Sequence, residues 1–192
     1  MKRRTFDGLL SWAGLAITVI LVLSGGALLV AHNFATSNVN KNLTAQKIFF
    51  PPAGDEALAS PQIGPYLNKY AGQQLTTGAQ AEAYANHFIA VHLSEVADGK
   101  TYSEVSNLSR ANPDDAVLAE QVQTLFRGET LRGLLLNAYA FGVFGTIALW
   151  AALGAFVGAA VMGLLTVLGF IHSRRVSAEE EIGRPTVVAA AA

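Results

Sequence analysis

Two histidines and a glutamate lie within nine residues of one another in the stretch YANHFIAVHLSEV, Tyr84–Val96. Imidazole and carboxylate groups perform general acid–base catalysis and ligate metals. A metal pair on one helix needs a spacing of three or four residues, as in H-E-x-x-H. His87 and His92 are five apart, so they diverge by roughly 140° on a helix. His92 and Glu95 have a suitable spacing, but a metal would require a third ligand, such as Glu82.

The interpretation of this pair depends on the face of the helix that it occupies. On an uninterrupted α-helix over residues 79–97, His92 and Glu95 both fall within one apolar stripe. We therefore expect the two side chains to share a proton or a hydrogen bond inside a helical bundle, which would make the bundle mildly pH-sensitive. A solvated helix face and a metal or catalytic site are the alternatives. The apolar stripe comprises Ala81, Tyr84, Ala85, Phe88 and Val96.

A second polar motif, FRGETLRG at residues 126–133, precedes a long apolar tract. Arg127 and Arg132 flank Glu129, which favours ion pairing at a membrane interface. Alternatively, the two guanidinium groups contact lipid phosphate or the carboxylate of a partner, for which their bidentate geometry is suited. The chain has no cysteine, and we find neither a nucleophile–base set nor a phosphate-binding loop. The sequence therefore predicts a protein that is not an enzyme and has no cofactor.

Two long tracts of the chain carry no charge. The composition is 52% hydrophobic and 14% charged, whereas about a quarter of the residues in soluble domains are charged. No Lys, Arg, Asp or Glu occurs between Asp7 and Lys41, or between Arg132 and Arg174. Both tracts exceed the roughly 20 residues that a helix needs to cross about 30 Å of hydrocarbon. The sequence thus predicts an all-α membrane protein with two transmembrane helices flanking a small extracytoplasmic helical bundle.

Basic residues at both ends of the chain predict its orientation. Lys2, Arg3 and Arg4 precede the first apolar tract, and Arg174 and Arg175 follow the second. Because lysine and arginine beside spanning helices favour the cytoplasmic side, we expect both termini to be cytoplasmic. The predicted segments are residues 1–7 (cytoplasmic), 8–31 (first transmembrane helix), 32–132 (extracytoplasmic domain), 133–144 (juxtamembrane helix extension), 145–171 (second transmembrane helix) and 172–192 (disordered cytoplasmic tail).

The N-terminus allows a competing interpretation. The RRTF motif at residues 3–6 resembles a twin-arginine export signal, and small residues at Ala35 and Ser37 would permit cleavage after Ser37. The apolar core of a signal peptide typically has 7–15 residues. Since the first tract here is much longer, we expect a retained membrane anchor.

The second tract is too long for one perpendicular crossing. As a single helix it would reach roughly 60 Å, twice the hydrocarbon thickness. We therefore expect residues 133–144 to pack on protein above the bilayer. Small residues on the crossing helix let two backbones approach closely, and the first helix, a second copy or another protein are the candidate partners. The predicted packing face comprises Ala151, Gly154, Ala155, Gly158, Ala159 and Gly163.

Start signals for helices organise the segment between the two tracts. Residues 77–80 and 101–104 each have the Thr-x-x-Gln/Glu spacing of a capping box. The stretch 49–65 contains four prolines and two glycines, which interrupts regular structure. Asn112, followed by Pro113 and two aspartates, predicts the start of a last helix that continues into the second apolar tract.

Three segments carry a resemblance to one family. They are AQKIFFPP at 45–52, AGQQLTTGAQAEAYANHFIAVHL at 71–93 and QTLFRGETLRGLLLNAYAF at 123–141. These segments resemble a family of short two-pass membrane proteins from actinobacteria that has no assigned activity. The resemblance covers most of the chain except the tail, and it implies an actinobacterial plasma membrane. Some members carry a label as LigA-like aromatic ring-opening dioxygenases, but the diverging His87 and His92 give no support to the iron site which that chemistry needs.

These features together predict a non-enzymatic accessory or scaffold protein, whose exported helical domain binds a partner in a membrane or envelope complex. The alternatives are an exported ligand-sensing module that signals through a partner, and a metal-dependent enzyme. The expected partners are the lipid bilayer and either another membrane protein or a second copy of the chain. The formal net charge of −1 gives no argument for binding nucleic acid.

Overall fold

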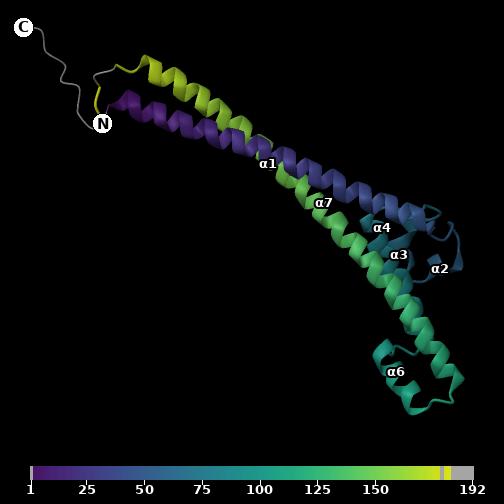
Figure 1. Ribbon diagram of the computed structural model, residues 1–192. Coiled ribbons are helices and arrows are strands. Elements are labelled where there is room, and N and C mark those ends of the chain that lie inside the picture. Colours follow the sequence, from purple (N-terminus) through teal and green to yellow (C-terminus); the bar gives the residue numbers. More distant parts are fainter. Residues whose placement is uncertain (1, 178–179, 183–192) are drawn as a thin grey trace, which may run out of the picture. The chain divides into compact units, whose positions relative to one another are not determined.

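The computed structural model describes residues 2–177 and 180–182, and within these ranges the chain is mostly helical and contains no β-strand (Figure 1). The helical part of the predicted fold class is therefore confirmed for the described residues. The predicted disordered tail lies mostly outside them. The chain divides into two compact units, one formed by residues from 1–31 and 148–192 and the other by His32–Ile147.

Two helices are much longer than the rest. Helix α1 spans Arg3–Gln46 and α7 spans Ala116–Arg175, and each contains a stretch long and apolar enough to cross a membrane (Figure 1). The predicted crossings, residues 8–31 and 145–171, lie inside these helices. The predicted extension at residues 133–144 is part of α7, which continues without a break through Gly128 and Gly133.

In the first unit, α1 and α7 pack along a seam that repeats every seven residues. On α7 the buried side chains are Ala152, Ala159, Thr166 and Ser173. On α1 the contacts come from Ser11, Gly14, Thr18, Leu21 and Gly25. A seven-residue repeat averages 3.5 residues per turn, which is the period of left-handed coiled-coil packing. Small residues let the backbones approach, because a Cβ added at Gly14 would lie 2.5 Å from Thr166 Oγ1.

This seam divides the predicted packing face. Ala159 is buried, and a Cβ added at Gly158 or Gly163 would lie 3.5 Å from a side chain of α1. Ala151 and Gly154 are exposed, and an added Cβ at Gly154 meets nothing within 4 Å. The reason is geometric, since a stripe of residues spaced by four drifts around an α-helix that has 3.6 residues per turn.

The second unit contains the short helices and its own hydrophobic core. Besides parts of α1 and α7, it consists of α2 (Glu56–Ala59), α3 (Gly64–Leu67), the 3₁₀-helix η1 (Asn68–Tyr70), α4 (Gly78–Ala83), the π-helix η2 (Tyr84–Ile89), α5 (Ala90–Val96) and α6 (Tyr102–Ala111). The largest fully buried side chains are Leu67, Leu75, Val105 and Leu125, which come from four separate stretches of the chain. Their burial holds the loops and short helices on α7.

The predicted helix starts are largely confirmed. Capping boxes are present at Thr77 and Thr101, where each hydroxyl accepts the backbone amide three residues later. The last helix differs from the prediction, because its capping side chain is Asp115 rather than Asn112. The Asp115 carboxylate accepts the amides of Val117 and Leu118 at 2.9 and 3.1 Å. Asparagine and aspartate cap equally well, so the local pattern did not discriminate between the two positions.

The π-helix η2 changes the face that α5 presents to the core. The amide of Ala90 donates to the carbonyl of Ala85, five residues back. A π-turn accommodates an extra residue, so every side chain beyond it is rotated by roughly 100° relative to an uninterrupted α-helix. The buried side chains accordingly repeat every four residues, at Ala81, Ala85, Ile89, Leu93 and Ala97.

Candidate functional site

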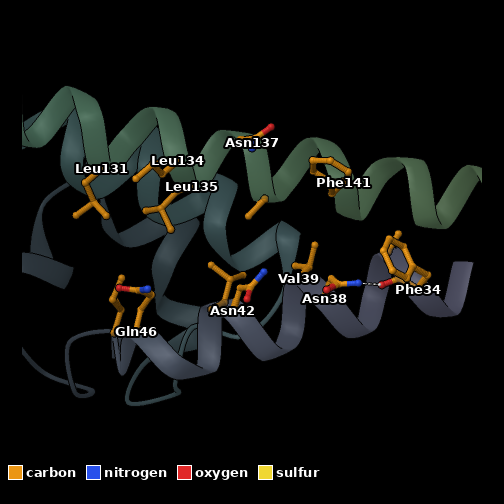
Figure 2. Close-up of a pocket in the computed structure, with 14 residues that line it drawn as sticks. Phe34, Asn38, Val39, Asn42, Gln46, Leu131, Leu134, Leu135, Asn137 and Phe141 are labelled. Atoms are coloured by element: carbon orange, nitrogen blue, oxygen red, sulfur yellow. Dashed lines mark hydrogen bonds between the residues drawn. The ribbon is translucent and has the colours of Figure 1, made fainter. Parts of the chain in front are cut away.

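A groove of about 480 Å³ lies between α1 and α7 in the second unit (Figure 2). On α1 it is lined by residues that recur at three- and four-residue intervals, and on α7 by residues of the stretch 131–141. Figure 2 shows leucine side chains of α7 on one side and amide side chains of α1 on the other. The lining residues are Phe34, Ala35, Asn38, Val39, Asn42, Leu43, Gln46, Ile48, Leu131, Leu134, Leu135, Asn137, Ala138 and Phe141.

The α1 wall combines apolar side chains with three amides that share one face. Asn38, Asn42 and Gln46 follow each other at intervals of four residues, which places them in a row along the helix. The Asn38 amide donates to the Phe34 carbonyl at 2.9 Å. No hydrogen bond is formed by the side chains of Asn42 and Gln46 within the part of the chain that the structure describes. Both amides are therefore available to a bound molecule.

Apart from Asn137, the α7 wall is apolar, and it is partly uncovered. Leu135 is only 2% exposed and belongs to the core, whereas Leu134 and Phe141 are 64% and 51% exposed. Phe34, at one end of the groove, is 69% exposed. None of the residues that line the groove is charged. The groove thus offers exposed apolar surface beside unpaired amides, a combination that marks interaction sites on proteins.

The opposite side of α7 carries a polar network that attaches η2. Arg132 donates from Nη2 to Asn86 Oδ1 and from Nη1 to Glu129 Oε2, both at 3.3 Å. The Asn86 amide in turn donates to Glu82 Oε1 at 2.9 Å. Arg132 thereby bridges α7 and the π-helix, and its Nε is buried without a hydrogen-bond acceptor in the described residues.

Two arginines that the sequence placed together have different environments. Ion pairing between Arg132 and Glu129 is confirmed by the 3.3 Å contact. Arg127 is exposed and forms no hydrogen bond or ion pair with another described residue. A contact of Arg127 with lipid phosphate or with a partner stays a prediction.

The histidines do not form one site. His92 and Glu95 are both exposed, so their predicted position inside the bundle is wrong. His92 Nδ1 lies 2.7 Å from the carbonyl oxygen of Phe88. His87 instead stacks on the ring of Tyr66, with centroids 3.4 Å apart. The error follows from the π-helix, which turns Leu93 toward the core in place of its neighbour His92.

Neither the described residues nor the similarity searches identify a known activity. No cluster of three or more His, Asp or Glu side chains that could hold a metal ion occurs among the residues that the structure describes. No protein-family model, curated protein or solved structure matches the chain. The lining residues of the groove offer apolar contacts and hydrogen bonds to amide side chains.

Sequence reasoning missed the groove, although one signal was present. The amides at Asn38, Asn42 and Gln46 continue the first apolar tract with a strict four-residue interval. A row of amides on one face of a helix that has left the apolar tract indicates a contact surface. Its partner wall, on α7, is about 90 residues away in the sequence, and only the fold brings the two walls together.

Proposed function

We propose that this chain is an integral plasma-membrane protein that works as a non-enzymatic accessory subunit, with both termini in the cytoplasm and the second unit outside. In this proposal α1 and α7 each cross the bilayer once, and the unit His32–Ile147 binds a helix of another membrane protein. The observation that carries the proposal is the uncharged groove between α1 and α7, with its exposed apolar wall. The resemblance to actinobacterial two-pass proteins is in agreement with this setting.

The groove suits a helix that extends from the membrane. Phe34 comes three residues after the predicted first crossing, and from there to Gln46 the groove follows α1 for about 18 Å, or roughly three helical turns. A partner helix would place aliphatic side chains against Leu131 and Leu134. Serine, threonine or backbone groups on the same helix would bind the amides of Asn42 and Gln46. An uncharged groove has no means of holding a strongly charged segment.

A charge placed in the groove tests the docking. Leu134 and Val117 are both on α7 and are exposed to the same extent, 64% and 65%, but only Leu134 lines the groove. We expect Leu134→Glu to lose a stoichiometric partner that the unmodified chain and Val117→Glu both retain in gentle detergent. Retention of that partner by Leu134→Glu would refute docking in the groove.

Cross-linking locates the partner directly. Since the chain has no cysteine, a single cysteine at Asn42 places one reactive thiol in the groove. We expect this thiol to cross-link the partner that is recovered by affinity purification, whereas a thiol at the exposed Asp114 does not. Equal cross-linking from both positions would show contact outside the groove.

Single cysteines also test the orientation. A membrane-impermeant maleimide is expected to label Asp114→Cys in intact cells, and Arg4→Cys only after lysis. The reverse pattern would place the second unit in the cytoplasm and remove the basis for an extracytoplasmic partner.

A second function is favoured by the volume of the groove. At about 480 Å³ it is within the range of sites for small molecules. In a ligand-sensing protein, an apolar ligand would raise the melting temperature of the unmodified chain but not that of Leu134→Glu. Such an increase in the absence of any stoichiometric partner would favour sensing over the accessory role.

A further inference from the structure

The groove in the second unit has two different ends. Figure 2 shows the aromatic side chains of Phe34 and Phe141 at one end, and Gln46 and Leu131 at the other. The aromatic end adjoins the proposed membrane crossings of α1 and α7. The other end, called the outer end here, lies about 18 Å farther along α1. A docked helix therefore has its membrane-distal part beside Gln46 and Leu131.

An arginine continues the α7 wall of the groove beyond the outer end. The residues that follow Arg127 by 4, 7, 11 and 14 positions all line the groove, namely Leu131, Leu134, Ala138 and Phe141. These intervals repeat the 3.6-residue period, so Arg127 lies on the same face of α7 as the groove. Arg127 is exposed and forms no hydrogen bond or ion pair with another residue that the structure describes. Its guanidinium group is therefore available to a molecule that extends along the groove past Leu131.

The α1 wall ends at a second cation. Lys47 is exposed and comes between Gln46 and Ile48, both of which line the groove. Its backbone φ of 53° is in the left-handed region, which favours glycine over a residue with a side chain. The chain between Asp7 and Asp55 contains no other carboxylate residue, so this stretch supplies no counter-ion. Positive charge thus adjoins the outer end of a groove that is itself uncharged.

Distance from the bilayer separates the two anions that Arg127 could bind. Arg127 precedes Gly145, where the proposed second crossing begins, by 18 residues, or about 27 Å along α7. Even a helix tilted by about 40° would keep it roughly 20 Å from the hydrocarbon. The headgroup layer extends only about 5–8 Å beyond the hydrocarbon on each side. A carboxylate on a protein can therefore reach Arg127, whereas a phosphate of the bilayer cannot.

We propose that the helix bound in the groove carries an aspartate or glutamate that pairs with Arg127 at the outer end, where Lys47 adds to the positive potential. The pairing rests on the proposed function, because it requires a helix docked in the groove. An uncharged groove lets an apolar helix slide, and one ion pair at its end fixes the register. Asn42 lies one helical turn inside the outer end and Arg127 one turn outside it. The carboxylate is therefore about seven residues from the partner residue level with Asn42.

Disulfide tethering tests the pairing with synthetic helices. The full chain with Asn42→Cys, in mild detergent and a fixed glutathione redox buffer, is equilibrated with helical peptides of leucine, alanine and serine that have one central cysteine. The peptides differ only in carrying Glu or Gln seven residues before or after that cysteine, and intact-mass spectrometry measures the tethered fraction. We expect one of the two Glu peptides to tether with an equilibrium constant about threefold greater than its Gln counterpart. The difference should disappear at about 0.5 M salt, which screens an exposed ion pair.

Substitutions in the Asn42→Cys chain identify the cation. Arg127→Gln is expected to remove the preference for the Glu peptide, and Arg127→Glu to replace it by a preference for a Lys peptide, a rescue that a misfolded variant would not show. Arg110→Gln, at an exposed arginine of α6, should leave the preference unchanged. Lys47→Gly should weaken the preference without lowering the melting temperature, because glycine accepts the left-handed backbone of this position.

The possible failures of docking and of pairing are distinguishable. If Glu and Gln peptides tether equally, but better than to an exposed thiol at Asp114→Cys, helices dock in the groove and the carboxylate pairing is refuted. If no peptide tethers better than to Asp114→Cys, docking itself is refuted. A preference for Glu that survives Arg127→Gln would exclude Arg127 as the cation. Loss of the preference on addition of phosphatidylglycerol, but not of phosphatidylcholine, would show that lipid phosphate occupies Arg127 instead.

Discussion

Replacing Leu93 and His92 in turn by alanine tests the register that the π-helix imposes on α5. Leu93 is 8% exposed and packs on Gly128 of α7, where an added Cβ would lie 2.4 Å from Leu93 Cδ2. His92 is exposed, and its ring lies against Phe88 with centroids 4.4 Å apart. Neighbouring residues of one helix should therefore differ strongly in their contribution to stability.

The expected magnitudes follow from burial. Truncation of a buried leucine to alanine costs about 2–5 kcal/mol, and Gly128 has no side chain that could fill the space, so we expect about 3 kcal/mol for Leu93→Ala. For His92→Ala we expect a change within about 0.5 kcal/mol, as for most surface positions. In a unit of this size, about 3 kcal/mol lowers the melting temperature by roughly 10 °C or more.

Limited proteolysis of the full chain in mild detergent, measured across a temperature series, reports the melting of the second unit. Leu93→Ala should become susceptible at a clearly lower temperature, and His92→Ala should follow the unmodified chain. On an uninterrupted α-helix the order would be reversed, because His92 would face the core. A larger loss for His92→Ala than for Leu93→Ala would thus refute the π-register.

Three further predictions concern the second unit. Gly78→Leu should destabilise it by more than about 2 kcal/mol, because a Cβ added at Gly78 would lie 3.2 Å from the backbone of α7. Gly133→Ala should stabilise it by about 0.5–1 kcal/mol in the same proteolysis assay, because a Cβ added at Gly133 meets nothing within 4 Å. Hydrogen bonds from the N-cap of α6 lower the pKa of Glu104 below its usual 4.5. That stabilisation is complete above pH 4.5 and is lost as the pH falls through the lowered pKa. The protection of α6 amides against hydrogen exchange, expressed relative to the intrinsic exchange rate at each pH, should therefore fall in acid, except in Glu104→Gln. Arg132→Gln should lower the stability of the second unit in thermal melting by about 1–2 kcal/mol, because it breaks the hydrogen bond to Asn86 of η2. Arg127→Gln should leave the stability unchanged. Equal effects of the two substitutions would contradict the network.

Features that depend on near neighbours in the chain could be predicted. The two apolar tracts, the capping boxes at Thr77 and Thr101 and the continuation of the last helix into the second tract were all visible as local patterns. Even the error at Asn112 was small, since Asp115 caps the helix three residues later. Capping depends on hydrogen bonds between residues two or three apart, and hydrocarbon thickness sets the length of an apolar tract.

Features that depend on contacts between distant segments could not be predicted in the same way. The groove joins amides on α1 to leucines on α7, and the seam of the helix pair selects Ala152 and Ala159 rather than Ala151. The spacing of small residues showed that α7 has a face suited to close packing, but not which side the first helix would cover. That choice depends on how well the facing side chains fit.

The sequence by itself determined that the chain is helical, where α4 and α6 begin, and that two of its helices are apolar enough to span a membrane. The tertiary structure alone decided which face of residues 84–97 is buried. A π-turn is rare and occurs mostly as a single turn within a helix. Packing of Leu93 on Gly128 and of Gly78 on the backbone of α7 favours it here. Those contacts join segments that are more than 30 residues apart, and for that reason His92 points to solvent and not to the core.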